Sequence, residues 1–248
     1  MTEERYFKFT YSVLLVPMIA VLLIWIVFWV EVRFRVNLND FGVYPRTLKG
    51  LRGILFSPFI HGSLSHLYNN TIPLAVLSAA LVYFYRDVAL KVFLLGFLLA
   101  GILTWLIGRP SYHIGASGMI YVLASFIFFK GAFTRHYRLM ALSLIVVFIY
   151  GSMLWYIFPV KEGISWEGHL AGFITGLVLA FALRAEVPKP RKYAWERDDY
   201  NEEEDEFLRH FDQDGNFMER PKDAEESKPQ VQIRYHYRKD KPKPPEDS

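Results

Sequence analysis

The sequence has 248 residues, of which 52% are hydrophobic and none is cysteine, and its net charge is +3. Residues 1–184 contain 15 Lys/Arg and 7 Asp/Glu, whereas residues 185–248 contain 13 Lys/Arg and 18 Asp/Glu. Seven acids in 184 residues are too few for an ordinary soluble surface, which excludes a single globular domain in water. The absence of cysteine excludes disulfide scaffolds, thiolate metal sites and cysteine nucleophiles.

Long windows without charged residues predict membrane-spanning helices in residues 1–184. Crossing the apolar core of a bilayer takes roughly 20 apolar residues, with a range of about 17–25. Five windows contain 17 to 33 uncharged residues, and a sixth, between Glu167 and Arg184, contains 16. We therefore predict an all-α membrane protein whose six transmembrane helices lie near residues 10–30, 64–85, 90–108, 115–130, 138–158 and 168–184.

Charges beside these helices indicate the orientation. An even number of helices places both termini on one side, and the charged tail favours the cytoplasm. The short loops on that side are flanked by the basic residues that the positive-inside rule prefers, namely Arg86, Lys91, Lys130, Arg135 and Arg138. The first loop opposes this orientation, because its five basic residues would face outward. We predict a multi-pass protein of a prokaryotic plasma membrane with both termini cytoplasmic; an organelle membrane is the alternative.

Two segments differ from the predicted helices in composition. Residues 31–62 combine Pro45 and Pro58 with apolar side chains, which is typical of a segment lying in the headgroup region of a membrane. Residues 185–248 are rich in charge and proline, which predicts a mostly disordered cytoplasmic tail. We expect this tail to tether, to regulate or to bind an unknown cytosolic partner, and the sequence does not choose among these roles.

The fourth predicted helix carries a serine between small residues. Ser117 stands between Gly115 and Gly118, and Tyr121 follows one helical turn later. Flanking glycines let a substrate approach a hydroxyl closely, as a nucleophile requires. Glycine and serine also let membrane helices pack closely, so this motif alone leaves packing and catalysis open.

The second and sixth predicted helices carry further polar groups at membrane depth, where each needs a partner or a function. His66 and Asn70 are four residues apart and share one helix face. His169 is followed by Gly172 and Gly176, whose spacing is typical of close helix contact. Taken alone, His169 fits a structural hydrogen bond as well as a catalytic base.

A metal site is the alternative reading of the histidines. His61 and His66 are five residues apart, roughly 140° around a helix, so they cannot chelate from one face. The sequence contains no HExxH motif. We therefore predict neither a metal nor another cofactor, and no nucleic-acid partner.

Three motifs together resemble those of the rhomboid intramembrane serine proteases. They are His61-x4-His66-x3-Asn70, Gly115-x-Ser117-Gly118-x2-Tyr121 and His169-x2-Gly172-x3-Gly176. The resemblance covers about residues 50–182 and implies a six-helix rhomboid-like protease domain at 1–184. It departs at Leu51-Arg52, where the family commonly carries an aromatic residue before the arginine, and anchoring of the first loop is therefore less firmly implied.

The resemblance implies a catalytic dyad without an acid. Ser117 would be the nucleophile and His169 the general base, and Tyr121 would stack on the histidine ring and fix its orientation. The oxyanion would be held by the backbone N–H of Ser117 and by the side chains of His66 and Asn70.

Other motif residues receive supporting roles. By the same resemblance, His61 orders the first loop. The glycines Gly115, Gly118, Gly172 and Gly176 would allow close approach of the helices that carry the dyad.

The function implied is hydrolysis of peptide bonds in or near the membrane spans of single-span proteins, with the lipid bilayer as the second partner. The alternative is a non-catalytic rhomboid-like protein that binds or dislocates membrane clients. A transporter or channel is disfavoured, because the sequence has no duplicated inverted halves and almost no charge within its predicted spans.

Overall fold

The computed structural model describes residues 9–135, 137–149, 155–185, 193, 195 and 197–219. The chain divides into two compact units, Met1–Pro190 and Arg191–Ser248. Within the described residues the structure is helical, and extended backbone pairs only at two isolated bridges, between Val43 and His113 and between Phe211 and Phe217. The predicted all-α fold is confirmed for this part of the chain.

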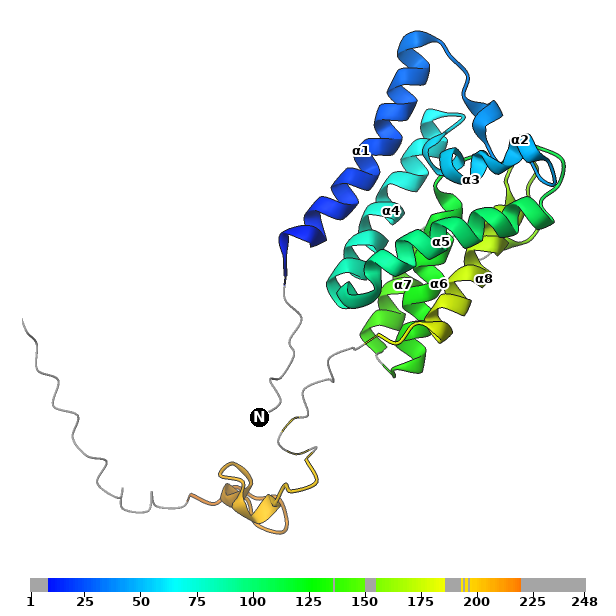
Figure 1. Ribbon diagram of the computed structural model, residues 1–248. Helices are drawn as coiled ribbons and strands as arrows, with labels where there is room; N and C mark the ends of the chain where they lie inside the picture. Colours follow the sequence, from blue (N-terminus) through cyan, green and yellow to red (C-terminus); the bar gives the residue numbers. More distant parts are fainter. Residues whose placement is uncertain are drawn as a thin grey trace, which may run out of the picture. The chain divides into compact units, whose positions relative to one another are not determined.

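Eight α-helices form in the described part of the first unit (Figure 1). They are α1 (Tyr11–Phe34), α2 (Leu48–Leu51), α3 (Gly53–Phe56), α4 (Leu64–Phe84), α5 (Arg86–Ile107), α6 (Ser117–Phe133), α7 (Tyr137–Ile149) and α8 (Trp166–Ala182). Short 3-10 helices lie between them, namely η1 (Asn39–Phe41), η2 (Ser57–Phe59) and η3 (Trp155–Ile157).

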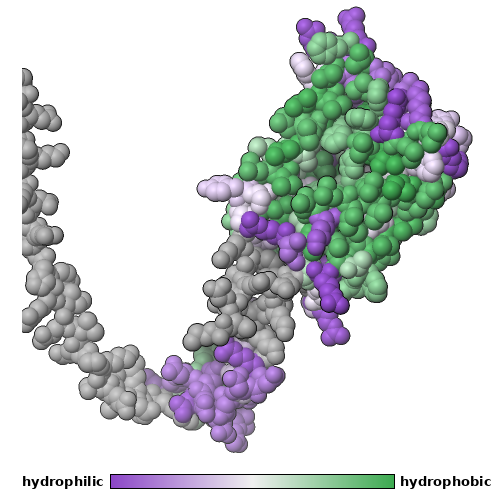
Figure 2. Space-filling view, viewed as in Figure 1, coloured by the Kyte–Doolittle hydropathy of each residue, from purple (hydrophilic) through white to green (hydrophobic). Residues whose placement is uncertain are grey.

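Three of these helices are long and apolar enough to cross a bilayer. They are α1, α4 and α5, with 24, 21 and 22 residues. The helices α6 and α8 are apolar but have 17 residues each, which corresponds to about 26 Å of helix. Figure 2 shows apolar side chains across the face of the first unit, with hydrophilic side chains gathered toward its ends. The protein is an integral membrane protein, and helix length alone leaves the predicted count of six spans unestablished.

The predicted fifth span, 138–158, is wrong at its C-terminal end. Trp155–Ile157 form a 3-10 helix, and residues 158–160 are not helical. Pro159 explains this difference, because the proline ring disfavours the α conformation at the preceding residue, Phe158. Residues 150–154 lie outside the described residues.

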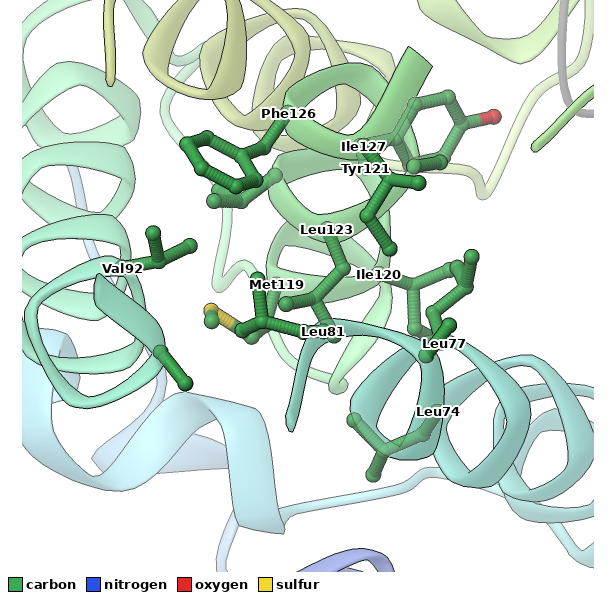
Figure 3. Close-up of a cluster of buried hydrophobic side chains, with 14 of the residues drawn as sticks. Leu74, Leu77, Leu81, Val92, Met119, Ile120, Tyr121, Leu123, Phe126 and Ile127 are labelled. Carbon is green, nitrogen blue, oxygen red and sulfur yellow. The ribbon is translucent and has the colours of Figure 1, made fainter. Parts of the chain in front are cut away.

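The central helix of the first unit is α6, which packs against α4, α5, α7 and α8. A helix that is apolar on all sides is expected at the centre of a bundle. Accordingly, Val122, Leu123, Phe126 and Ile127 of α6 are fully buried. Figure 3 shows Leu123, Phe126 and Ile127 in one cluster with Leu77 and Leu81 from α4 and Val92 from α5. This core fixes the start of α6, where Ser117 lies.

The first loop is held to the rest of the unit by several hydrogen bonds. Val43 exchanges backbone hydrogen bonds with His113, and the Arg46 guanidinium donates to the carbonyls of Leu106 and Gly108 at the end of α5. Within the loop, the guanidinium carbon of Arg52 lies 4.2 Å from the centre of the Phe41 ring.

The aromatic partner that Arg52 lacks in the adjacent sequence position is therefore supplied by Phe41. The guanidinium also donates to the carbonyl of Asp40, 2.9 Å away. The arginine is thus anchored by a cation–π contact and by a carbonyl, and the first loop is not left without its anchor.

The described part of the second unit contains two 3-10 helices, η5 (Glu202–Glu204) and η6 (Leu208–His210). The Asp212 carboxylate accepts hydrogen bonds from the backbone N–H groups of Asp214 and Asn216. The tail predicted to be mostly disordered spans 185–248, and its residues 186–192, 194, 196 and 220–248 lie outside the described residues. Residues 197–219 form turns and the two 3-10 helices, and a cytosolic partner for the tail stays a prediction.

Candidate active site

Ser117 and His169 lie at the same end of two tightly packed helices. Ser117 is the first residue of α6, and His169 is in the first turn of α8. The Nε2 atom of His169 is 2.9 Å from Ser117 Oγ, although 52 residues separate them in the sequence. His169 is buried and Ser117 is partly buried. A hydroxyl and an imidazole are therefore within proton-transfer distance, largely shielded from solvent.

The orientation of the His169 ring is fixed by two contacts. Its Nδ1 atom lies 2.9 Å from the carbonyl oxygen of Tyr156, in η3. A carbonyl only accepts, so Nδ1 carries the proton and Nε2 presents its lone pair to the Ser117 hydroxyl. The Tyr121 ring stacks on the imidazole, with ring centres 4.4 Å apart and planes inclined by 17°. These contacts supply the tautomer and orientation that an aspartate supplies in a triad.

His66 and Asn70 approach Gly115, two residues before Ser117. A Cβ atom at Gly115 would lie 2.6 Å from His66 Nε2 and 3.5 Å from Asn70 Nδ2, and the φ angle of Gly115 is +106°. Glycine is therefore required here for both space and backbone conformation. The Ser117 N–H belongs to the first turn of α6, where a helix has no internal acceptor.

Asn70 has an unused donor at this position. Its side chain is buried, and Nδ2 has no hydrogen-bond partner among the described residues. A buried unpaired donor is costly, so such groups usually serve a purpose. An oxygen that gains negative charge beside Ser117 would find this amide, the Ser117 N–H and the His66 ring close to it.

We expect Asn70→Ala to lower kcat by at most about 10²–10³-fold, because one of several oxyanion donors is removed. Cleavage of a fluorescent single-span substrate measures this effect. Asn69→Ala is the matched control, since Asn69 is the preceding residue of α4 and is exposed. An equal loss in both variants would contradict the assignment of Asn70.

The glycines of α8 lie against α6. A Cβ atom at Gly172 would be 2.1 Å from the carbonyl oxygen of Gly118, and one at Gly176 would be 1.9 Å from Ser125 Oγ. The two backbones therefore approach more closely than any side chain allows. At the far end, Lys130 of α6 donates to the carbonyls of Ala180 and Leu183, which close α8.

His61 links the first loop to the segment before Ser117. Its Nδ1 atom lies 3.2 Å from the Phe59 carbonyl, and its Nε2 atom lies 3.4 Å from the backbone N–H of Ala116, which donates to it. The ring is buried, and its centre is 4.9 Å from that of His66. Both ring nitrogens face backbone groups, so His61 connects the end of the first loop to the segment before Ser117.

Buried histidines in the loops predict sensitivity to acid. Burial, and secondarily the nearby His66, lowers the pKa of His61 from 6.5 to about 4. Burial also lowers the pKa of His113. The unfolded chain binds protons at these positions as the pH falls below 6.5, whereas the folded chain does not, so the free energy of unfolding decreases with falling pH. For His61 alone the full loss is about 3 kcal/mol near pH 4.

Thermal unfolding in detergent between pH 7.5 and 4.5 measures this dependence. We expect the melting temperature to fall as the pH is lowered, and His61→Gln to show a shallower slope than the unchanged protein. A melting temperature that rises toward pH 4.5 would contradict the prediction.

A small polar cavity adjoins Ser117. Its volume is about 50 Å³, and its polar lining comes from Ser57, Thr104, His113, Ser117 and Ser165. A cavity of this size and polarity has room for about three water molecules. Among the described residues, no group of three His, Cys, Asp or Glu side chains is placed to hold a metal ion.

Three functional candidates have no signal in the sequence motifs. Tyr156 acts through its backbone carbonyl, which any residue type would provide. Ser165 caps α8 by accepting from the Gly168 N–H. Glu167 is part of the first turn of α8 and is only 1% exposed. The predicted span 168–184 begins one residue too late to include this buried acid. A capping serine three residues before a glycine is the one signal that could have found Ser165.

Comparisons with known proteins identify the family of this chain. Residues 49–186 match the model of the Rhomboid domain. An uncharacterized protein of Mycobacterium tuberculosis and another of Mycobacterium bovis are each 37% identical over 171 residues, covering 63% of this chain and 68% of the relative. An uncharacterized protein of Mycobacterium leprae is 34% identical over 178 residues, covering 68% of this chain and 70% of the relative. The chain belongs to the rhomboid family.

Proposed function

We propose that this protein is an intramembrane serine endopeptidase that hydrolyses peptide bonds in or near the membrane spans of its substrates. The observation that carries the proposal is the 2.9 Å contact between His169 Nε2 and Ser117 Oγ. The Tyr156 carbonyl supports it, because this acceptor leaves Nε2 free to act as a base.

In the first half of the reaction, Ser117 Oγ attacks the carbonyl carbon of the scissile peptide, and His169 Nε2 accepts the hydroxyl proton. The carbonyl oxygen becomes an oxyanion and receives hydrogen bonds from Asn70 Nδ2, the Ser117 N–H and the His66 ring. His169 then donates its Nε2 proton to the amine as the C–N bond breaks. An acyl-enzyme on Ser117 remains.

In the second half, water attacks the acyl carbon while His169 Nε2 accepts a proton from it. Breakdown of the second tetrahedral intermediate returns the proton to Ser117 Oγ and releases the new carboxylate. Lipid excludes water, so an intramembrane hydrolase needs a polar space beside its nucleophile. The cavity lined by Thr104, His113 and Ser165 supports this requirement.

The proposal includes six membrane spans with both termini in the cytoplasm of a prokaryotic cell. The apolar helices α6 and α8 would span at the centre of the bundle, where neighbouring helices cover them, and α7 would be the sixth span. The substrates are proposed to be single-span proteins with helix-weakening residues near one end of the span, because a regular helix shields its peptide bonds.

The test is labelling of the purified protein by a fluorophosphonate together with cleavage of a panel of fluorescent single-span substrates. The unchanged protein should label and cleave, and Ser117→Ala should do neither. Cleavage that persists in Ser117→Ala would identify a contaminating protease.

The alternative is a non-catalytic rhomboid-like protein that binds membrane clients. Such a protein would also belong to the rhomboid family, which includes inactive members. Its function, however, would not require the paired Ser117 and His169. A folded protein that neither labels nor cleaves, yet binds single-span proteins, would replace the proposed protease with this alternative.

A further inference from the structure

A second serine–histidine pair joins the two segments that carry Ser117 and His169, and each of its residues lies four positions earlier in its segment. His113 precedes Ser117 by four residues, and Ser165 precedes His169 by four. His113 Nδ1 lies 2.6 Å from Ser165 Oγ. The two pairs therefore connect the same two segments, with the serine and histidine exchanged between them.

The donors and acceptors of this pair follow from its other contacts. His113 Nε2 lies 3.1 Å from the Arg109 carbonyl, which only accepts, so Nε2 carries the proton. His113 Nδ1 therefore accepts from the Ser165 hydroxyl. Ser165 Oγ in turn accepts from the Gly168 N–H, and the Ser165 carbonyl accepts from the His169 N–H. Ser165 is therefore hydrogen-bonded directly to the backbone of His169, the proposed base.

His113 uses all four of its polar groups in this way. Its backbone N–H and carbonyl pair with Val43 in the first loop, and its ring joins the end of α5 to the start of α8. The side chain is buried. It is the junction of three segments, and the chain leads from it through three residues to Ser117.

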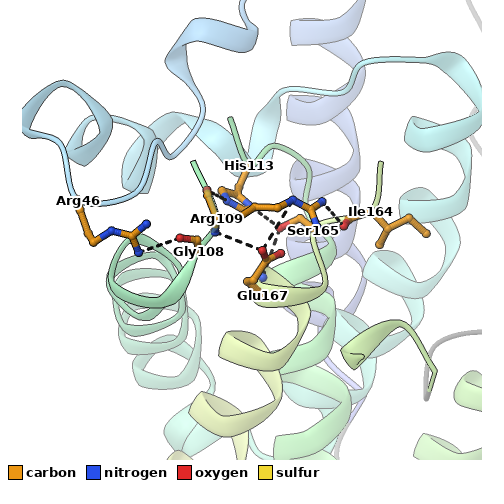
Figure 4. A network of polar contacts seen from close by, with 8 residues as sticks. Arg46, Gly108, Arg109, His113, Ile164, Ser165 and Glu167 are labelled. Carbon is orange, nitrogen blue, oxygen red and sulfur yellow. Dashed lines mark hydrogen bonds and ion pairs between the residues drawn. The ribbon is translucent and has the colours of Figure 1, made fainter. Parts of the chain in front are cut away.

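A second connection runs parallel to this pair (Figure 4). The Arg109 N–H donates to Glu167 Oε1, 3.2 Å away, and the Arg109 guanidinium donates to the Ile164 carbonyl, 2.7 Å away. Arg109 and Glu167 also form an ion pair at 3.8 Å. Together the two connections join the loop before α6 to the first turn of α8 on both sides of Ser165.

We propose that the His113–Ser165 pair is a positioning device that sets the distance between Ser117 and His169. This inference rests on the proposed protease function. The pair does not touch the reacting atoms; it acts through the backbone of the two helix starts. Without it, α6 and α8 stay packed through their glycines and Arg109 still contacts Glu167 and Ile164, but the start of α8 loses its hydrogen bond to the residue four positions before Ser117.

The experiment measures the rate of fluorophosphonate labelling and its concentration dependence in the full-length protein. Ser165→Ala removes the pair and the cap of α8. His113→Phe removes the pair and the hydrogen bond to the Arg109 carbonyl but keeps the cap, and Ser165→Thr keeps the hydroxyl. Thr47→Ala is the matched control, because Thr47 caps α2 by accepting from the Gly50 N–H and lies outside the site. Melting temperature is recorded for each variant.

We expect Ser165→Ala and His113→Phe to slow the maximal labelling rate by about 10- to 100-fold, with the half-saturating concentration unchanged. Ser165→Thr should recover most of the rate, and Thr47→Ala should label like the unchanged protein. The loss in the double variant should be smaller than the product of the two single losses, since both changes break the same His113–Ser165 hydrogen bond.

Labelling of His113→Phe at the unchanged rate in a folded protein would overturn the inference and leave the protease function standing. Failure of the unchanged protein to label would overturn the protease function itself. If Ser165→Ala fails to fold, His113→Phe decides, because it keeps the cap of α8.

Discussion

Replacement of His169 by alanine is expected to lower kcat by roughly 10⁴-fold or more. Within the described residues, the His169 imidazole is the side chain that hydrogen-bonds to Ser117 Oγ, and without it the serine hydroxyl loses this base. A serine hydroxyl is a weak nucleophile at neutral pH unless a base removes its proton. Cleavage of a fluorescent single-span substrate and labelling by a fluorophosphonate both measure the loss.

The control for this prediction is His210→Ala. His210 lies in the second unit, in η6, and is not part of the site. It should retain the activity of the unchanged protein. Substantial cleavage by His169→Ala, with normal activity in His210→Ala, would mean that another group serves as the base and that the 2.9 Å contact is structural.

The helices that carry this site could be predicted because the length of an uncharged, apolar stretch can be read directly from the sequence. Windows between charged residues located α4 and α6 within a few residues. The same signal failed after η3, where Pro159 disfavours helical backbone at Phe158 within an uncharged window. Charge marks where a helix leaves the membrane, whereas backbone stereochemistry decides where a helix ends inside it.

The residues of the site could be predicted only where they follow helical periodicity. His66 and Asn70 share a face because they are four residues apart, and the same holds for Ser117 and Tyr121. The contact between Ser117 and His169 spans 52 residues, so it came from resemblance to a family and not from spacing.

Helical periodicity gives no signal for contacts made by backbone groups or by side chains that are far apart in the sequence. The Tyr156 carbonyl orients the base through an atom that every residue possesses, and Phe41 reaches Arg52 from eleven residues upstream. Glu167 was placed outside a span because acids rarely enter one. Its carboxylate is buried because Arg109 donates to it, which is a tertiary contact that composition does not contain.

Because α6 and α8 touch at Gly172, we expect Gly172→Ala to reduce activity more than the other single added methyl group that we consider. The added carbon would lie 2.1 Å from the Gly118 carbonyl oxygen and 3.0 Å from the Tyr121 Cβ. A backbone oxygen cannot rotate away as a side chain can, so the helices must separate. Gly118 follows Ser117 directly, and His169 lies one turn before Gly172, so the separation moves nucleophile and base apart.

A displacement of about 1 Å can cost about 10²-fold in rate, and we expect Gly172→Ala to lose at least that much of kcat. Gly118→Ala tests the reason, because it adds the same methyl to the same interface, where the nearest atom outside its own helix is the Gly168 carbonyl oxygen at 3.4 Å. That distance is ordinary contact, so its loss should be much smaller. Rates and melting temperatures of both variants measure the difference. Equal losses would show that the α6–α8 interface tolerates no added volume anywhere, and that the close contact at Gly172 does not by itself hold Ser117 to His169.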